Sequence, residues 1–457
     1  MLALITGAVE DRTARGIAAA VGRLVSAGSL PAGARLPTVR DVARELGVSP
    51  TTVSEAWRSL ARAGAIQTRG RSGTFVSPPV VPRQSWRYSQ MGPSPATRWD
   101  LSTGIPDHDL LPDLTDALKR IGDGRLTTSY LDEPVLPMLE TVLRNRWPFP
   151  PEGLTVVDGA LDAIDRIIGE VVSFGDHVIV EDPAFPPLLD LLQTVGASVI
   201  GVPMDDHGIV PDRLHAALTG HPAVALFLQP RAHNPTGVSM SPSRAAALAA
   251  VLAGFPDVVV VEDDHAGDIA GAPPVSLGRH LSARTVHVAS FSKSHGPDLR
   301  LAAIGGPAPI VAAVADRRLL GPGWSSRLLQ AVLLDLLTDP VAVAQVAAAR
   351  DAYAGRREAM LSRLRERGVT ASAADGINLW MAVDDQQIAM VSLAARGIAV
   401  APGTPFCVTP AATDHVRVTV GLVADGFDDL AGALASAAIL DSRGSGARAR
   451  PHPRGWR

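Results

Sequence analysis

The chain is 457 residues long, with 46% apolar and 19% charged residues, which predicts a globular protein of two or three domains. Its one cysteine, Cys407, excludes an intramolecular disulfide and suits a reducing compartment. We find neither a leader pattern nor an apolar run approaching the roughly 20 residues that span a membrane, so we expect a cytoplasmic protein without membrane contact.

Charge is distributed unevenly along the chain. The net charge is +5 in residues 1–78, another +5 after Asp441, and −14 between these segments. A basic N-terminal segment on an acidic body indicates that this segment, and not the body, meets a polyanion.

Residues 12–28 carry apolar side chains at helical spacing and predict a helix that ends at Gly28. Residues 36–64 predict two helices joined by a tight turn, the first capped by Thr38 and the second by Ser49. The stretch AIQTRGRSGTFVS alternates in polarity around a Gly-Arg-Ser-Gly turn, as a β-hairpin does. These elements together predict a winged helix, whose second paired helix would enter the major groove of DNA.

The stretch LPTVRDVARELGVSPTTVSEAWRSLARAGAIQTRGRSGTFV resembles the DNA-binding domain of the GntR regulators over its full length. The resemblance implies DNA contacts from Arg40, Thr51, Thr52, Ser54, Arg69, Gly70 and Arg71. The chain departs from the family pattern at Pro50, where arginine is usual, and at Ser54, where another arginine is frequent. Both departures would weaken DNA binding or change its specificity. A winged helix that contacts protein instead of DNA is the alternative.

Two segments lack the periodicity of helices and strands. Residues 79–98 are rich in Pro, Ser and Arg and predict a semi-rigid linker between the winged helix of residues 1–78 and a body of residues 99–441. Residues 442–457 predict a disordered basic tail, with nucleic-acid contact by its arginines as the alternative.

Five apolar runs of strand length recur between helical stretches in the body: LTVV, HVIVE, AVALFLQ, DVVVVE and TVHVASF. Continuous apolar strands that alternate with helices predict an α/β fold with a mainly parallel sheet covered on both faces. Polar or glycine-rich sequence follows each run. These loops should therefore gather at the edge of the sheet where ligands of such folds bind.

Lys293 follows the last of these runs, and it is one of only two lysines in a chain with 40 arginines. A lysine amine, unlike a guanidinium, can lose its proton and attack a carbonyl. With the neighbouring loops, this predicts a site for pyridoxal 5′-phosphate (PLP), whose aldehyde can form an imine with Lys293. Asp263 would keep the pyridine nitrogen protonated, and Arg300 would bind the phosphate.

Further contacts to PLP are expected from the same loops. Gly159, Ala160 and Leu161 open a helix whose free amides and dipole favour an anion. Ser290 and Ser292 can donate hydroxyls, Asn234 can donate to the phenolic oxygen, and Phe185 can stack on the ring. An ordinary core position is the alternative for Phe185. No cluster around His233 or His265 has metal-ligand spacing, so we expect no metal site.

The motifs HNPTG, EDD and SFSKxxxPxxR resemble those of fold-type I aminotransferases in order and spacing, over nearly the whole body. The resemblance assigns the imine to Lys293, the pyridine nitrogen to Asp263, the ring oxygen to Asn234 and the phosphate to Arg300. It further implies that Tyr130 reaches the phosphate of a neighbouring subunit. Arg417 would grip a substrate carboxylate, with a structural ion pair as the alternative.

Departures from the aminotransferase pattern lie at the ring and at the phosphate loop. His265 stands where tyrosine is usual beside the ring oxygen, and histidine can titrate near neutrality. The loop VDGALD lacks the usual Ser/Thr and Gln donors and brings Asp158 and Asp162 near an anion. These changes imply a less tightly held cofactor and impaired turnover.

A GntR-type winged helix joined to an aminotransferase-like body, with a smaller C-terminal α+β domain, resembles the MocR branch of bacterial transcription regulators. The resemblance implies a head-to-tail homodimer that binds double-stranded promoter DNA and responds to PLP or to an amino compound. An active aminotransferase with an auxiliary DNA-binding domain is the main alternative. A degenerate body that serves only for dimerisation is another.

Overall fold

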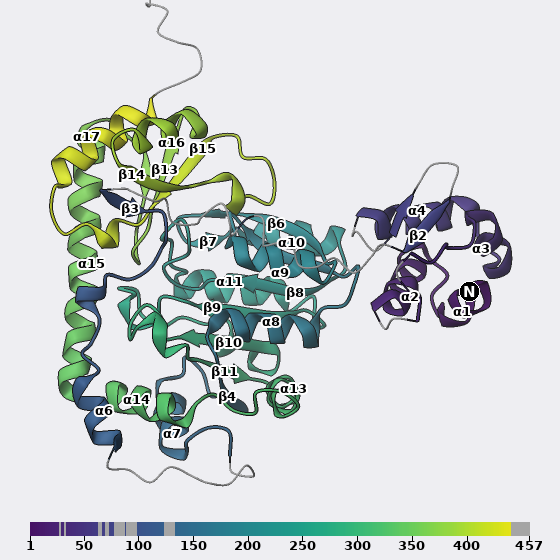
Figure 1. The fold of residues 1–457 in the computed structure, drawn as a ribbon, viewed down its shortest axis with the longest axis horizontal. Coiled ribbons are helices and arrows are strands. Elements are labelled where there is room, and N and C mark those ends of the chain that lie inside the picture. Colours follow the sequence, from purple (N-terminus) through teal and green to yellow (C-terminus); the bar gives the residue numbers. More distant parts are fainter. Residues whose placement is uncertain are drawn as a thin grey trace, which may run out of the picture.

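The computed structural model describes residues 1–26, 29–31, 33–62, 66–68, 73–76, 87, 98–122 and 133–439. A small N-terminal unit, called the head below, lies beside a much larger body (Figure 1). The described elements of the head are α1 (Leu2–Ala8), α2 (Ala14–Ser26), α3 (Val39–Leu46), α4 (Pro50–Arg62), β1 (Ile66–Thr68) and β2 (Thr74–Val76).

The expected helix pair and hairpin are confirmed in the head. The side chain of Thr38 accepts a hydrogen bond from the amide of Asp41 at the start of α3, and Ser49 does the same for Thr52 in α4. Strands β1 and β2 pair antiparallel. Helix α1 was not expected from the sequence; it buries Ile5 in the core of the head.

The central sheet of the body has eight strands in the order β4-β11-β10-β9-β8-β5-β6-β7. Its strands are β4 (Gly153–Val157), β5 (His177–Asp182), β6 (Ser198–Asp205), β7 (Gly208–Ile209), β8 (Ala223–Leu228), β9 (Val259–Asp264), β10 (Thr285–Ser290) and β11 (Ala302–Gly306). All five predicted strands are present, and the pairs from β6 to β10 through β5, β8 and β9 are parallel.

Strand β11, like β6 and β7, was not predicted from the sequence. It lies between β4 and β10 and runs antiparallel to both, so β4 and β10 keep a common direction. The carboxyl ends of the five predicted strands therefore meet at one edge, as expected. The sequence AAIGG consists of small residues, and Gly305 is required because an added Cβ would lie 2.6 Å from the Trp147 side chain.

Helices cover both faces of this sheet. The described helices in this part of the body are α6 (Thr115–Gly122), α7 (Pro137–Arg146), α8 (Ala160–Val171), α9 (Pro186–Thr194), α10 (Pro211–Gly220), α11 (Pro242–Leu252), α12 (Gly278–Leu281), α13 (Ala308–Leu319) and α14 (Arg327–Thr338), on which α6 packs. Residues of α8, α9 and α13 share one core cluster with the sheet, and residues of α10 and α11 share another. Two packed layers thus enclose the apolar strands.

A second, five-stranded sheet has the order β12-β13-β15-β14-β3. Its strands are β3 (Trp99–Leu101), β12 (Ala371–Ser372), β13 (Leu379–Val383), β14 (Ile398–Pro402) and β15 (Asp414–Val418), and its helices are α15 (Pro340–Glu366), α16 (Gln386–Ala394) and α17 (Phe427–Ala438). Helix α15 runs along one side of the body towards this sheet (Figure 1). Strand β3 pairs with β14, so the small sheet combines both ends of the body.

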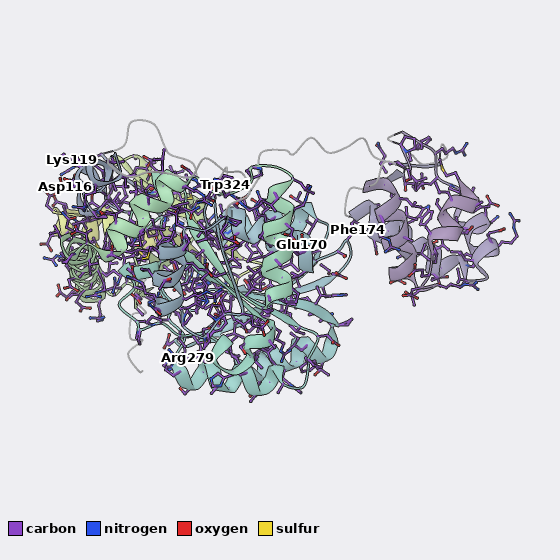
Figure 2. All side chains as sticks on the ribbon, turned by 90° about the horizontal axis from the view of Figure 1, so that it is seen from below. Asp116, Lys119, Glu170, Phe174, Arg279 and Trp324 are labelled. Atoms are coloured by element: carbon purple, nitrogen blue, oxygen red, sulfur yellow. The ribbon has the colours of Figure 1, made fainter. Side chains whose placement is uncertain are left out.

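Phe174, in the loop after α8, joins the body to the head. Its ring packs against the apolar core cluster of the head, and Figure 2 shows it on the side of the body that faces the head. An added Cβ would lie 2.9 Å from this ring at Gly22 of α2 and 2.4 Å from it at Gly196. The ring is therefore held between two glycines, one from each unit.

No single helix among the described residues is long and apolar enough to cross a membrane. Helices α14 and α15, bent by 76° at their junction, reach the necessary length and composition only as a pair.

Candidate functional site

Lys293 lies in the loop after β10, at the edge where the strand ends meet. Its Nζ donates a hydrogen bond to the carbonyl of Gly104. Burial of the ammonium group, reinforced by the positive charge of Arg417, lowers the pKa of Lys293 to about 8. Lys119, in contrast, is 71% exposed and pairs with Asp116 on the surface of the body (Figure 2). Only Lys293 of the two lysines has the environment of a nucleophilic amine.

Asp263 lies at the end of β9, next to the strand that precedes Lys293. Its Oδ2 accepts a hydrogen bond of 2.8 Å from Nε2 of Gln229, while its buried Oδ1 has no hydrogen-bond partner among the described residues. Burial raises the pKa of Asp263, and the charge of His265 and the bond from Gln229 act in the opposite direction. An unsatisfied buried carboxylate oxygen calls for a donor from a ligand.

Asn234 and Arg417 lie together between the two sheets. Nη1 of Arg417 is 3.3 Å from Oδ1 of Asn234, and Nη2 donates to the carbonyl of Ser102. Arg417 is 1% exposed, and its guanidinium lies 5.4 Å from the ring of Phe406. The guanidinium thus contacts the side-chain amide oxygen of Asn234 and the backbone carbonyl of Ser102.

Phe185 and His265 flank the same region. Phe185, half-buried at the start of α9, lines one pocket with Asp263. Nε2 of His265 is 2.9 Å from the carbonyl oxygen of Ala232, which only accepts, so this nitrogen carries the hydrogen. Burial lowers the pKa of His265. Because the Ala232 carbonyl engages Nε2, Nδ1 is the ring nitrogen of His265 that remains for a ligand, whereas the usual tyrosine offers a hydroxyl group.

The N-terminus of α8 lies at the same edge. Gly159 has a φ of 107° and precedes Ala160 and Leu161, whose amides open the helix. Nη2 of Arg300 donates to the carbonyl of Asp158, and an added Cβ at Gly159 would lie 3.1 Å from that nitrogen. Only glycine leaves room for the guanidinium so close to the helix end.

The two serines extend this row of polar groups. Ser290 is buried at the end of β10 and pairs in register with Ala302, which pairs in turn with Val157 of β4. The amide of Ser292 donates to Oγ of Ser290 at 3.4 Å. Ladder geometry thus places Ser290 and the α8 N-terminus at one edge of the sheet.

Arg318 is a functional candidate that the sequence did not single out. It is 2% exposed on α13, and it binds Asp158 at 3.0 Å and Asp162 at 2.8 Å. Ser325 donates to the other oxygen of Asp158 at 2.6 Å. The acids expected to repel a phosphate are therefore engaged by a buried cation, which offsets their charge.

Residues 102–104, after β3, form a second feature that the sequence missed. The carbonyl of Ser102 accepts from Arg417 and that of Gly104 from Lys293. Gly104 has a φ of 66°, and an added Cβ would lie 3.0 Å from Nη1 of Arg417. Glycine is required here, but one glycine among 42 gave no signal in the sequence.

In the head, Arg40 is exposed on α3 and Thr51 is exposed near the start of α4, while Thr52 and Ser54 are partly buried. Arg69, Gly70 and Arg71 of the wing lie outside the described residues, as does Tyr130 of the body. Among the residues that the structure describes, no group of three or more His, Cys, Asp and Glu side chains could hold a metal ion.

These residues fit PLP by their own chemistry. Asp263 presents an unsatisfied buried oxygen for the pyridine nitrogen, and a glycine-lined helix N-terminus with Arg300 suits a phosphate dianion. Bound PLP supplies an aldehyde that reacts with amines and a ring that withdraws electrons. Lys293 would hold it covalently, Asn234 would face the ring oxygen, and Arg417 would orient a carboxylate.

Fold and site together define a PLP-binding protein of the aminotransferase fold that carries a winged-helix head. A family model for aminotransferases of class I and II matches residues 97–434, and one for bacterial regulatory proteins of the gntR family matches residues 13–76. The chain belongs to the MocR-like branch of the GntR transcription regulators, which bind DNA through the head.

Two curated relatives span most of the chain. The vitamin B6 salvage pathway transcriptional repressor PtsJ of Salmonella typhimurium is 36% identical over 425 residues, 91% of this chain and 96% of PtsJ. The transcriptional regulator TauR of Rhodobacter capsulatus is 30% identical over 433 residues, 84% of this chain and 87% of TauR.

The body also resembles solved aminotransferase structures. The α-aminoadipate aminotransferase LysN of Thermus thermophilus, complexed with N-(5'-phosphopyridoxyl)-L-leucine, superposes with a TM-score of 0.67 at 20% identity. The match covers 77% of this chain and 97% of LysN. This likeness shows the fold that the sequence predicted.

Proposed function

We propose that the body is a sensor, in which PLP or an amino compound that reacts with PLP at Lys293 changes how the head binds promoter DNA. Lys293, Asp263, Asn234 and Arg300 are assigned to the cofactor. Arg417 is assigned to the carboxylate of an effector that has one. Membership of the family does not by itself identify the effector.

The observation that carries the proposal is the position of residues 102–104. This short segment contacts both Lys293 and Arg417, and it continues backwards through β3 directly into the linker that leads to the head. An effector that reacts with Lys293 and offers a carboxylate to Arg417 competes with the carbonyls of Gly104 and Ser102. Displacement of this segment would alter the path of the chain towards the head.

A second contact supports the same route. Nη1 of Arg87, the one linker residue that the structure describes before residue 98, is 3.4 Å from the carbonyl oxygen of Pro405. Pro405 precedes Phe406, whose ring lies beside the guanidinium of Arg417. A ligand biases such an arrangement only through its difference in affinity between the two states of the protein.

An aminotransferase that turns over is the second candidate function. The joint presence of Lys293, Asp263 and Arg417 in one candidate site favours it, since these groups also serve catalysis in aminotransferases. Against it, His265 has its Nε2 hydrogen engaged by the Ala232 carbonyl and lacks the hydroxyl group that the usual tyrosine would offer. Sensing requires only binding and exchange at Lys293, whereas turnover requires repeated proton transfer and product release.

The quaternary arrangement belongs to the same proposal. We assign a head-to-tail homodimer in the cytoplasm, with Tyr130 directed to the phosphate in the partner. Exposed apolar side chains on α7, α13 and α14 support a self-association surface on the body. They are Met138, Leu319, Leu320 and Leu328.

Paired measurements on one preparation test the proposal. The anisotropy of a labelled duplex from the region upstream of the protein's own gene reports DNA affinity, during titration with PLP and then with a panel of amino acids and primary amines. Release of keto acid over many cycles is followed in the same samples. We expect an amine to change DNA affinity at concentrations where keto-acid release is slow or absent.

Lys293→Ala should lose the response to amines while DNA binding persists, and Lys119→Ala, an exposed lysine, should behave as the native protein. Rapid and sustained keto-acid production with DNA binding indifferent to PLP and to every amine would identify an enzyme and refute the sensor proposal.

A further inference from the structure

We propose that Gln229 is a positioning residue, which sets Asp263 and Asn234 in the arrangement that PLP requires. The inference rests on the proposed assignment of these two residues to the cofactor. Gln229 follows β8 and belongs to none of the motifs that resemble those of aminotransferases.

One side-chain amide spans two neighbouring strand ends. Nε2 of Gln229 donates to Oδ2 of Asp263 at 2.8 Å, and its Oε1 accepts from the backbone amide of Asn234 at 2.8 Å. The side chain is 7% exposed, and β8 and β9 are adjacent parallel strands. Both ends of the amide are thus engaged by groups on which the cofactor site depends.

The orientation of the Gln229 side-chain amide, with its donor end towards Asp263, determines which oxygen of Asp263 is left for the ligand. An Nε2 group can only donate, and its bond occupies Oδ2 and leaves Oδ1 for the pyridine nitrogen. A donated hydrogen bond favours the charged carboxylate, against the burial that favours the neutral acid. Gln229 therefore orients Asp263 and helps to keep it charged.

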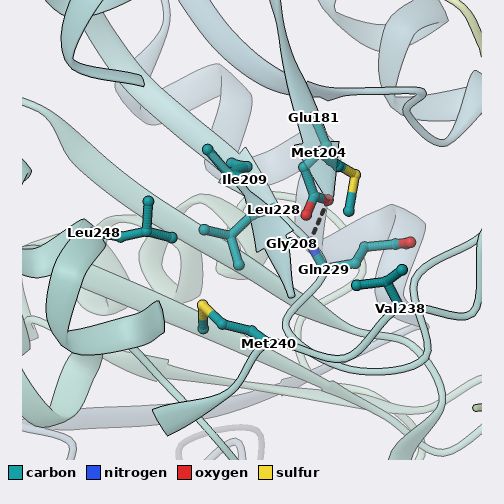
Figure 3. A pocket seen from close by; sticks show the side chains of 9 residues that line it. All are labelled: Glu181, Met204, Gly208, Ile209, Leu228, Gln229, Val238, Met240 and Leu248. Atoms are coloured by element: carbon teal, nitrogen blue, oxygen red, sulfur yellow. Dashed lines mark hydrogen bonds between the residues drawn. The ribbon is translucent and has the colours of Figure 1, made fainter. Parts of the chain in front are cut away.

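A hydrogen bond from the neighbouring strand β5 fixes the backbone of Gln229. Its backbone amide donates to Oε2 of Glu181 at 2.8 Å, and Figure 3 shows the two residues side by side in the wall of a pocket. Glu181 lies in β5, on the other side of β8 from β9. The hydrogen bonds of Gln229 consequently connect the ends of three adjacent strands. Of its three partners, Asp263 and Asn234 are assigned to the cofactor and Glu181 is not.

We expect substitution of Gln229 to change PLP binding through its effect on the orientation and charge of Asp263. In the full-length protein, Gln229→Met keeps the size of the side chain and removes both hydrogen bonds. We expect about tenfold or greater loss of PLP affinity, as for removal of a hydrogen bond to a charged group. The ¹⁵N chemical shift of PLP labelled at the pyridine nitrogen should move towards the unprotonated value. Gln229→Asn, which is too short to reach both partners, should act in the same direction but less strongly.

Gln330→Met is the matched control, because Gln330 is likewise a buried glutamine but its side chain bonds to backbone groups of Pro134, Leu136 and Ser325 rather than to Asp263. It should lower the melting temperature without moving the ¹⁵N shift. In an Asp263→Ala background, Gln229→Met should have no further effect on the ¹⁵N shift, because the group through which it acts is gone.

A folded Gln229→Met or Gln229→Asn protein with native PLP affinity and native ¹⁵N shift would overturn the inference. So would an equal shift in the Gln330→Met control. Failure of the native protein to bind PLP through Lys293 is a different result, which would refute the proposed cofactor site itself and is detected by borohydride reduction before any variant is compared.

Discussion

The head and the body hold the side chains that we assign to ligand binding in opposite ways. In the head, Arg40 and Thr51 project from the surface of short helices whose ends are fixed by Thr38 and Ser49. In the body, Asp263 is 8% exposed and Arg417 is 1% exposed, and each is bonded to groups from other strands or loops.

This difference determines at which residues a substitution can change ligand binding without changing the stability of the fold. An exposed side chain on a capped helix can be removed with little effect on stability, so the loss in ligand affinity is measured directly. A buried polar group belongs to a network, so its removal affects the fold and the site together. Variants of the body therefore need neighbouring controls that separate an effect on the fold from an effect on the site.

The largest effect is expected at Lys293. Lys293→Ala should abolish covalent attachment of PLP completely, because no other amine lies at the strand-end cluster among the described residues. Lys119→Ala should keep it, since Lys119 lies on the surface. Absorbance and mass spectrometry after borohydride reduction measure the outcome. A stable label on Lys119 would remove the contrast between buried and exposed sites.

Arg318→Met should cost about 2–3 kcal/mol of unfolding free energy, below the roughly 3–5 kcal/mol of a fully buried pair because Asp158 is 44% exposed. The released Asp158 and Asp162 would also repel the phosphate, so PLP affinity should fall. Urea unfolding and PLP titration measure both effects. Arg317→Met, at the exposed neighbouring position, is the control, and an equal loss there would show that Arg318 has no special role.

The reaction of PLP with the apoprotein should depend on pH through Lys293. The neutral amine is the nucleophile, and the pKa of Lys293 is about 8. Below pH 8 the rate should therefore fall about tenfold for each pH unit, and above pH 8 it should level off. Stopped-flow absorbance between pH 6 and pH 9.5 measures it. A rate that keeps rising tenfold per pH unit up to pH 9.5 would indicate an amine with an ordinary lysine pKa.

The smallest effect is expected in the head. Arg40→Ala should weaken DNA binding modestly and lower the slope of log affinity against log salt by about 0.9 for each phosphate that the variant no longer neutralises. Arg44→Ala, on the same helix but paired with Asp41 at 2.6 Å, should change the slope less. PLP affinity should be unchanged in both. An unchanged slope in Arg40→Ala would remove this residue from the DNA interface.

Much of the fold could be predicted from the sequence, because local signals agree with it. The caps at Thr38 and Ser49 and the five apolar runs each mark an element by composition alone. Strand β11 could not be predicted in this way, since AAIGG is selected for close packing against Trp147 and not for strand propensity. Tertiary contact overrides local preference there.

The residues of the candidate site likewise fall into those that a local motif could identify and those that only tertiary contacts reveal. Lys293, Asp263 and Arg300 could be named because a motif fixes their distance from a strand end. Gln229 and Arg318 could not, because Asp263 lies 34 residues from Gln229 and the two acids lie 156 and 160 residues from Arg318. The acids Asp158 and Asp162 signalled the need for a cation, but with 40 arginines the sequence could not say which one supplied it.

The pairing of β3 with β14 has a consequence for synthesis on the ribosome. The core cluster of the head involves residues 2–76 and, from the body, Phe174, whereas β3 must wait for a partner about 300 residues later. At roughly 5–20 residues per second this delay is about 15–60 s. The head can therefore acquire its fold while the small sheet is still open, and residues 102–104 can contact Arg417 only after residue 417 has been synthesised.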